Sequence, residues 1–355
     1  MNVQLLKLFQ YILTIRTFNF KIIKMNKTII LNSRPVGKPQ QSDFKVIGEE
    51  MPEIKDGEIL LKTKFVSVDP YLRGRMSDAK SYVPPFELQK AMSSGVVAEV
   101  TESQNEKFKV GDFVSGMLEW KEFQNSNGEN LLKIDEELAP LSNYLGVLGM
   151  TGLTAYFGLT EIGKPQKGET IVVSGAAGAV GSIVGQIGKI LGCRVIGIAG
   201  TDEKVELLKS KFGFDDAINY NTTKDMTKAI AEVCPDGVDV YYDNVGGTIS
   251  DSVHANINRL GRIIVCGAIS AYNDTSIPQG PRVEHFLIRK SVLMQGFIVS
   301  NYAENFPEGM KQLSQWLSEE KLHSEETIVE GFDNIPQAFL NLFEGKNTGK
   351  MIVKI

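Results

Sequence analysis

The feature that most constrains this chain is a glycine-rich turn between an apolar strand and an amphipathic helix. Gly175, Gly178 and Gly181 follow an apolar, strand-like run with the spacing G-x-x-G-x-x-G. We expect a helix to begin near Ala179, because apolar residues then recur on one helical face. These residues are Val180, Ile183, Val184, Ile187 and Leu191. An apolar run at 194–198 predicts a second strand, so the segment predicts a βαβ unit that binds a dinucleotide.

Each glycine has a separate role in such a unit. Gly175 lets the chain turn sharply off the strand, Gly178 lets the backbone approach a pyrophosphate, and Gly181 lets the helix pack closely on the sheet. The free N–H groups at the helix start carry partial positive charge, which favours a phosphate there. The glycines alone would be weak evidence, but the flanking strand and helix complete the motif.

The end of the second strand indicates which dinucleotide is bound. An acidic side chain there would hold the ribose 2′-OH of NAD, but residues 199–201 are Ala-Gly-Thr. The next basic residue is Lys204, whose charge suits the 2′-phosphate of NADP. The alternative is that Lys204 is a solvated lysine in the first turn of a helix, an interpretation that the neighbouring Asp202 and Glu203 favour.

Composition limits the kind of partner. A chain of 355 residues with 42% hydrophobic content suffices for two domains, each with its own core. A formal net charge of -5 and a pI near 5.5 give no basic footprint for nucleic acid or an anionic membrane. No apolar run is long enough to cross a bilayer. We therefore expect a globular protein that acts on a small molecule.

Cysteine usage and the N-terminal segment bear on the cellular compartment. Cys193, Cys234 and Cys266 are widely spaced in or beside apolar segments, so we expect reduced thiols in a cytoplasmic protein. Residues 1–24 contain no Asp or Glu and four basic residues, and we interpret them as an extension before a start at Met25. The alternative is a mitochondrial presequence, which is typically basic and poor in acidic residues.

The remaining chain shows two successive patterns of predicted secondary structure. Up to about residue 142, strand-like alternation punctuated by Gly and Pro predicts a compact β-rich domain. From 143 the chain alternates helices and strands, which is typical of an α/β doubly wound parallel sheet. The tail predicts a helix at 335–343 and a last strand at 351–355.

Metal-dependent chemistry is disfavoured by where the possible ligands lie. Zinc sites need Cys, His or carboxylate ligands in a tetrahedral array. The first cysteine is Cys193 and the first histidine is His254, so the N-terminal domain lacks both residue types. His254, His285 and His323 are isolated from one another and are interpreted as surface or packed side chains. We therefore predict no metal site.

Several motifs, in order, resemble those of a known family. They are VDPYLRGRM at 68–76, GMTGLTAYFGL at 149–159, the glycine turn, DNVGG at 243–247, CGAIS at 266–270 and GKMIVK at 349–354. From about Met25 onward the chain is similar to the zinc-independent medium-chain dehydrogenase/reductases. That branch includes prostaglandin reductases, leukotriene B4 dehydrogenases and NADP-dependent alkenal double-bond reductases. The resemblance implies a Rossmann domain at 143–319 inserted in a GroES-like catalytic domain, which comprises 25–142 and is completed by about 320–355.

The resemblance also implies the site residues. The cofactor-binding positions are Gly175, Gly178, Ala179, Val180, Gly181, Lys204, Tyr220, Asn244, Cys266, Gly267, Ala268, Ile269, Ser270, Tyr272, Phe297, Ile298, Val299 and Asn347. Core packing remains the alternative for Phe297, and capping of a turn the alternative for Asn244. Some animal members of the family have a tyrosine just before the strand LMQGFIV at 293–299, where this chain has Arg289. Contacts made by that tyrosine in those proteins are therefore not expected here.

The predicted chemistry is the reduction of a conjugated carbon–carbon double bond by NADPH. Without a metal, a nicotinamide enzyme can still reduce an α,β-unsaturated aldehyde or ketone by hydride addition to the β-carbon. Charge then collects on the carbonyl oxygen, where hydrogen-bond donors are needed. By resemblance, Tyr71 and Tyr272 are the candidate catalytic donors. Alternatively, Tyr71 is a packed wall residue and Tyr272 only covers the nicotinamide.

Two other functions and an oligomeric state complete the expectations. The chain could be an NADPH:quinone reductase of the same superfamily, or a nucleotide-binding module without turnover. The resemblance implies a homodimer formed through the edge strand of the nucleotide domain. An assay panel with enals, enones, 15-oxoprostaglandin-like substrates and quinones would separate the three functions.

Overall fold

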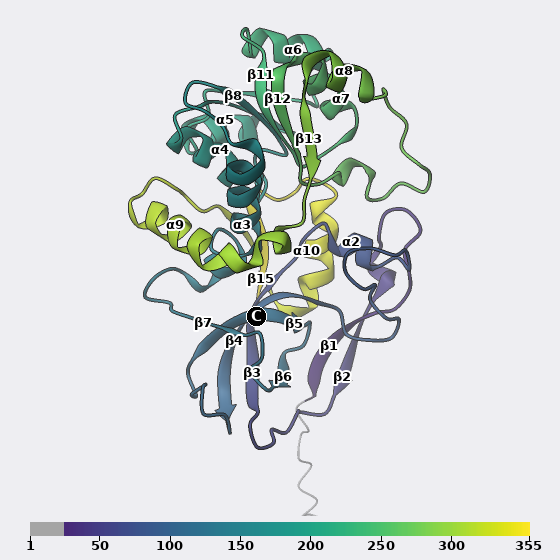
Figure 1. Cartoon of the computed structure of the whole chain (residues 1–355). Coiled ribbons are helices and arrows are strands. Elements are labelled where there is room, and N and C mark those ends of the chain that lie inside the picture. Colours follow the sequence, from purple (N-terminus) through teal and green to yellow (C-terminus); the bar gives the residue numbers. More distant parts are fainter. Residues whose placement is uncertain (1–24) are drawn as a thin grey trace, which may run out of the picture.

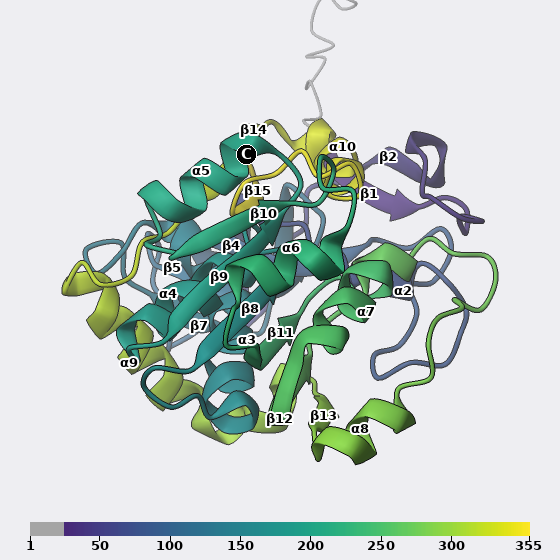
Figure 2. The same ribbon diagram turned by 90° about the horizontal axis from the view of Figure 1, so that it is seen from above.

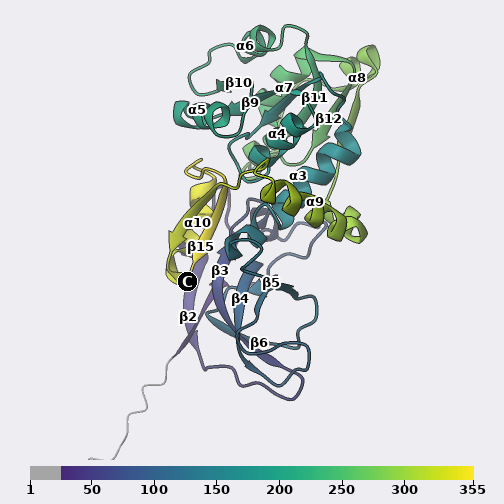
Figure 3. The same ribbon diagram turned by 90° about the vertical axis from the view of Figure 1, so that its left-hand side faces the viewer.

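The computed structural model describes residues 25–355, so the extension expected at 1–24 lies outside the described residues. The described chain forms two lobes, one above the other in Figure 1. The upper lobe holds a six-stranded sheet and most of the helices, and the lower lobe is rich in β-structure. The C-terminal segment returns to the lower lobe, where Figure 3 shows it beside the N-terminal strands.

The upper sheet is fully parallel, with the strand order β10-β9-β8-β11-β12-β13. Its strands are β8 (Thr170–Ser174), β9 (Arg194–Ala199), β10 (Asp216–Asn219), β11 (Val238–Asp243), β12 (Ile257–Val265) and β13 (Leu293–Gly296). In chain order this is 3-2-1-4-5-6, the order of the doubly wound dinucleotide fold. The predicted α/β fold class is therefore confirmed.

Helices cover both faces of this sheet (Figure 2). One face carries α3 (Met150–Phe157), α4 (Gly181–Ile190), α5 (Asp202–Ser210) and α9 (Phe306–Ser318), and the other carries α6 (Met226–Val233) and α7 (Gly247–Asn256); α8 (Glu284–Lys290) precedes the edge strand β13. Alternate strand residues supply the two cores, since Ile171 and Val173 face one layer and Val172 the other. Burial on both faces explains the continuous apolar runs of these strands.

Helix α4 begins slightly later than the apolar pattern suggests. It starts at Gly181 rather than near Ala179, because the preceding residues still belong to the glycine turn. Ile183, Val184 and Ile187 are buried on the predicted face. The apolar spacing thus identified the helix and its packing face, and only the first turn differed.

The lower lobe is built around a seven-stranded sheet. Its order is β14-β15-β3-β4-β5-β7, with β6 pairing β3. The strands are β3 (Ile59–Ser67), β4 (Ser93–Ser103), β5 (Phe113–Glu119), β6 (Phe123–Ser126), β7 (Leu132–Ile134), β14 (Glu326–Glu330) and β15 (Lys350–Lys354), beside the hairpin-like pair β1 (Asn26–Leu31) and β2 (Phe44–Glu49). The predicted C-terminal helix is α10 (Ile335–Leu342), and a short helix, α2 (Leu72–Arg75), follows β3.

Short helical turns connect these elements. Short 3-10 helices lie at Gln41–Asp43, Leu141–Leu145, Ile269–Ala271, Val299–Asn305 and Phe332–Asn334, and a π-helical turn at Gly158–Gly163 continues α3. Strand β15 pairs antiparallel with β3, so the last residues of the chain complete the sheet begun by its first third. This return brings the start of β15 to the junction of the lobes, where Gly349 forms a bridge with Gly178.

Candidate functional site

The predicted site residues follow the carboxyl ends of the parallel strands. Asn244 follows β11, Cys266 follows β12, Phe297 follows β13 and Tyr220 follows β10. Between β8 and β11 the strand order reverses, and such a switch point forms the ligand crevice of open α/β sheets. In Figure 1 the arrow of β13 points toward the lower lobe, so these strand ends face the junction of the lobes.

The glycine turn has the geometry that the three assigned roles require. Gly175 adopts a φ of +58°, in the region that favours glycine. A Cβ at Gly181 would lie 2.8 Å from Ala176 Cα, and closer still to the carbonyl oxygen of Gly175, so the helix start needs a glycine there. A Cβ at Gly178 would meet only the Gly175 oxygen, at 3.2 Å, and otherwise open space. The first and third glycines therefore shape the turn, and the second leaves room beside it.

Backbone donors at the start of α4 fit a phosphate. No side chain caps this helix, and within residues 25–355 the N–H groups of Val180 and Gly181 have no acceptor. Free N–H groups at a helix start form a site for anions. The donors and the space beside Gly178 thus suit the pyrophosphate of a dinucleotide.

The end of β9 holds the groups expected near the 2′-phosphate. Lys204 lies in the first turn of α5 and donates from Nζ to the carbonyl oxygen of Gly345, at 2.6 Å. Partial burial lowers the pKa of Lys204. The Tyr220 hydroxyl lies so close to Gly200 that a Cβ there would be 2.7 Å away. Asp202, the first acidic residue after the strand, accepts a hydrogen bond from the Asn219 amide, at 2.7 Å.

Asp243 organises the end of β11. Its carboxylate accepts hydrogen bonds from the Ser174 and Tyr241 hydroxyls and from the N–H groups of Val245 and Gly246, each at 2.9 Å. Asn244 follows directly and donates from its side chain to the Ser174 carbonyl, at 2.8 Å. Asn244 therefore ties the ends of β8 and β11 together, which is close to the capping role considered from the sequence.

The segment after β12 folds back under a tyrosine. The N–H of Ala268 donates to the Tyr272 hydroxyl, at 3.4 Å, and a Cβ at Gly267 would lie 3.1 Å from that hydroxyl. The Ser270 hydroxyl donates to the Val245 carbonyl, at 2.6 Å. Burial raises the pKa of the Cys266 thiol to about 12, so it stays protonated. Ile269 begins the one-turn helix that ends next to Tyr272.

The remaining predicted cofactor positions, residues 297–299 and Asn347, differ in what their side chains contact. Phe297 packs against Gly158, where a Cβ would be 2.7 Å from its ring, and this supports the packing interpretation. Ile298 and Val299 follow it at the start of a 3-10 helix. Asn347 donates from its side chain to the Gly349 carbonyl, at 2.9 Å. Arg289, the departure from the family pattern, is exposed on α8.

Tyr71 and Tyr272, which come from different lobes, line one cavity. This cavity of about 200 Å³ is bounded by Tyr71, Gly74, Arg75, Ser81, Tyr82, Val83 and Tyr272. Burial raises the pKa of both Tyr71 and Tyr272, so their hydroxyls stay protonated at neutral pH. A larger, open hollow of about 420 Å³ at 111–113 and 133–137 holds none of the predicted site residues.

Five of these cavity residues were not predicted as site residues from the sequence, among them Arg75 and Tyr82. Arg75 donates from Nε to the Pro84 carbonyl, at 3.1 Å, and its guanidinium lies over the Phe86 ring, 3.9 Å from the centroid. Tyr82 lies on the long connection between α2 and β4, and no periodic signal marks it. Arg75 lies within the VDPYLRGRM motif, so its position was a signal that could have been used.

Residues 25–355 contain no group of three or more His, Cys, Asp or Glu side chains that could hold a metal ion. In the same range, every helix is too short or too polar to span a membrane. His254 is buried against Phe286 and Tyr241, as expected of a packed histidine.

Comparison with known proteins identifies this architecture. Residues 27–134 match the family model described as the N-terminal domain of oxidoreductase, and residues 179–318 match the one described as zinc-binding dehydrogenase. A Bacillus subtilis protein named "Putative NADP-dependent oxidoreductase YfmJ" is 59% identical over 92% of this chain and 97% of its own. An NADP-dependent 2-alkenal reductase of Nicotiana tabacum is 41% identical over 93% of this chain and 97% of its own.

A solved structure agrees with these relatives. CurA from Vibrio vulnificus in complex with NADPH is 44% identical, with a TM-score of 0.88 over 92% of this chain and 98% of its own. Fold and site thus define an NADPH-dependent oxidoreductase with a Rossmann and a GroES-like domain. The chain belongs to the zinc-independent medium-chain dehydrogenase/reductase family, and the resemblance described from its motifs is confirmed.

Proposed function

We propose that this protein uses NADPH to reduce the carbon–carbon double bond of α,β-unsaturated aldehydes and ketones. The observation that carries the proposal is the convergence of Tyr71 and Tyr272 on one cavity beside the strand ends of the Rossmann sheet. The name of the tobacco relative, a 2-alkenal reductase, supports the same substrate class.

The proposed coenzyme site follows the strand ends. The N–H groups of Val180 and Gly181, at the turn that includes Ala179, would hold the pyrophosphate. Lys204 and Tyr220 would meet the 2′-phosphate. Asn244, residues 266–272 and 297–299, and Asn347 would line the nicotinamide half. Bound there, NADPH supplies the hydride for the β-carbon.

The two tyrosines are proposed to stabilise the oxygen on which charge collects. The Tyr272 hydroxyl accepts a hydrogen bond from the Ala268 N–H, so its own proton is free to be donated to a substrate oxygen. The Tyr71 hydroxyl makes no hydrogen bond within residues 25–355 and keeps its proton because burial disfavours the phenolate. Each can donate to the developing enolate oxygen, and solvent or a nearby hydroxyl then protonates the α-carbon.

A side-by-side assay tests the proposal. We expect NADPH oxidation with 2-nonenal at a higher kcat/KM than with benzoquinone. The reverse preference would make the protein a quinone reductase. Tight NADPH binding without reduction of either substrate would make it a nucleotide-binding module.

We also propose a homodimer joined through β13. This strand is one of the two edge strands of the upper sheet, and its residues are largely exposed, with Leu293 at 47%. Ile288, on the helix just before it, is 79% exposed. An unpaired apolar edge of this kind favours pairing with a second chain. Sedimentation velocity should show a dimer, and Leu293→Lys should shift it to monomer; a monomeric wild-type chain would contradict the proposal.

A further inference from the structure

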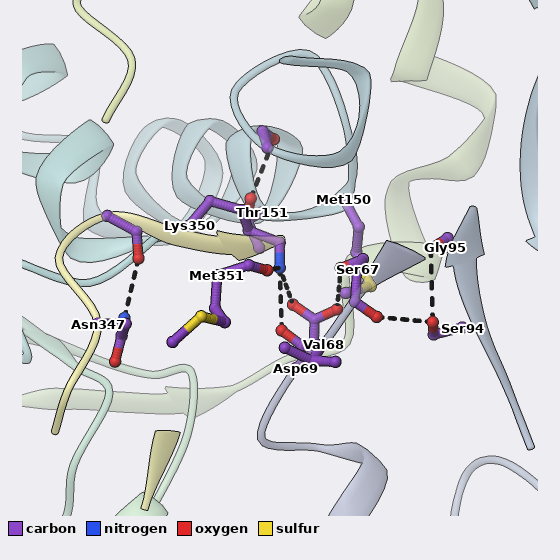
Figure 4. Close-up of polar contacts among 12 residues, drawn as sticks. Ser67, Val68, Asp69, Ser94, Gly95, Met150, Thr151, Asn347, Lys350 and Met351 are labelled. Atoms are coloured by element: carbon purple, nitrogen blue, oxygen red, sulfur yellow. Dashed lines mark hydrogen bonds and ion pairs between the residues drawn. The ribbon is translucent and has the colours of Figure 1, made fainter. Parts of the chain in front are cut away.

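A buried ion pair lies between the coenzyme turn and the substrate cavity. The Lys350 side chain is 4% exposed, and its Nζ lies 3.2 Å from Asp69 Oδ1. It also donates to the carbonyl oxygens of Val68, at 3.0 Å, and Met351, at 2.8 Å (Figure 4). Three acceptors match the three N–H donors of an ammonium group, so Lys350 is fully hydrogen-bonded.

On its substrate side, the pair fixes the loop that leads to Tyr71. Asp69 is 7% exposed in its side chain, and its second carboxylate oxygen accepts from the Ser67 hydroxyl. The backbone carbonyl of Asp69 accepts from the N–H of Leu72, at 3.1 Å, in the turn that contains Tyr71. Lys350 therefore holds both the carboxylate of Asp69 and the carbonyl of Val68, two and three residues before Tyr71.

On its coenzyme side, the neighbouring residue contacts the glycine turn. The N–H of Gly349 donates to the Ala177 carbonyl, at 2.7 Å, and Gly349 forms a parallel bridge with Gly178. Gly349 has a φ of +64°, and a Cβ there would collide with the backbone of Glu325. Gly349 thus contacts the glycine turn, and the next residue, Lys350, contacts the loop that leads to Tyr71.

We propose that Lys350 is a positioning residue: through Asp69 and Val68 it holds Tyr71 at a fixed distance from the glycine turn. The inference rests on the proposed function, in which these two segments hold the substrate and NADPH. Stability alone does not account for the pair, because well-packed apolar side chains can replace a buried ion pair without loss. Fixed spacing is what hydride transfer requires, since a misplacement of about 1 Å can lower the rate about 100-fold.

The test neutralises the Lys350–Asp69 ion pair in one variant and an ion pair far from the proposed site in a control variant. The double variant Lys350→Met/Asp69→Asn removes both charges together, so neither is left buried alone. The control variant Arg262→Met/Glu169→Gln removes an ion pair whose side chains are 18% and 24% exposed, at the opposite end of the parallel sheet from the site. We expect the first to lower kcat for 2-nonenal about 10- to 100-fold with NADPH Kd nearly unchanged, and the control to change neither.

Hydrogen exchange provides a readout that does not depend on turnover. In the wild-type protein we expect NADPH to protect amides at both 175–182 and 69–76, and in the double variant only those at 175–182. A double variant that keeps wild-type kcat, or that still shows protection at 69–76, would overturn the inference, as would a wild-type protein without protection at 69–76. Protection at both segments of a wild-type protein that reduces no enal would instead refute the proposed function.

A conservative variant tests the inference even if the double variant does not fold. Asp69→Glu keeps the charges but moves the carboxylate by one methylene group, so the ion pair persists with the loop displaced. We expect a normal NADPH Kd and a kcat lowered about 10-fold. A wild-type kcat for this variant would show that the position of the loop does not limit turnover.

Discussion

Replacing Gly178 with valine should abolish tight NADPH binding while leaving the fold intact. A Cβ at this position meets only the Gly175 carbonyl oxygen, at 3.2 Å, so it requires a shift of a few tenths of an ångström and displaces no packed side chain. Apart from that oxygen, the surroundings of the Cβ are open, and the free N–H groups of Val180 and Gly181 follow two and three residues later in the same turn. That space is where we place the pyrophosphate.

The expected magnitude follows from those two donors. A hydrogen bond to a charged group contributes about 1.5–3 kcal/mol, so loss of two weakens binding by about 3 kcal/mol or more. This raises the NADPH Kd about 100-fold, which fluorescence titration of the nucleotide can measure. Thermal unfolding of the apoprotein should shift by no more than about 2–4 °C.

Gly181→Ala is the matched comparison. Its Cβ would lie 2.8 Å from Ala176 Cα, inside a packed turn that cannot yield easily. We therefore expect this smaller substitution to lower the free energy of unfolding by about 1–3 kcal/mol. A stable Gly178→Val variant that binds NADPH like the wild-type protein would refute the placement of the pyrophosphate at this turn.

Three further predictions concern the coenzyme and the cavity. Lys204→Met should raise KM for NADPH about 10- to 100-fold and leave KM for NADH unchanged, because only NADPH carries the 2′-phosphate. Equal increases in both KM values would show that Lys204 does not bind the 2′-phosphate. Replacing Tyr71 and Tyr272 together with phenylalanine should lower kcat about 100-fold, and an unchanged kcat would exclude both as donors. Burial raises the pKa of both phenols, so the neutral donor form persists and kcat should stay flat from pH 7 to about 10. A loss of kcat as the pH rises from 7 to about 10, absent from the phenylalanine variant, would contradict this.

Local patterns were sufficient to predict much of the fold. The glycine spacing and the apolar face of α4 depend only on neighbouring residues, and both appear in the structure as expected. The buried strands β8 and β9 read as apolar runs because helices cover both faces of their sheet. The exact start of α4 was not predictable, because the residues from Gly178 to Val180 suit a turn as well as a helix.

The parts of the site that depend on long-range contacts were not predictable. Lys350 and Val68 are 282 positions apart, and nothing in the sequence near Lys350 indicates that its ammonium group is buried. Tyr82 lies in a long connection whose path is set by the cavity it lines, not by a repeating pattern. Lys204 illustrates a further limit, since its hydrogen bond to Gly345 brings together residues that only the folded chain makes neighbours.

The most direct test of the central claim is to identify the product formed from 2-nonenal and NADPH. We predict nonanal, with the carbonyl group intact and the double bond reduced, at a rate that a metal chelator does not change. Formation of the allylic alcohol, in which the carbonyl group is reduced and the double bond remains, would contradict the account.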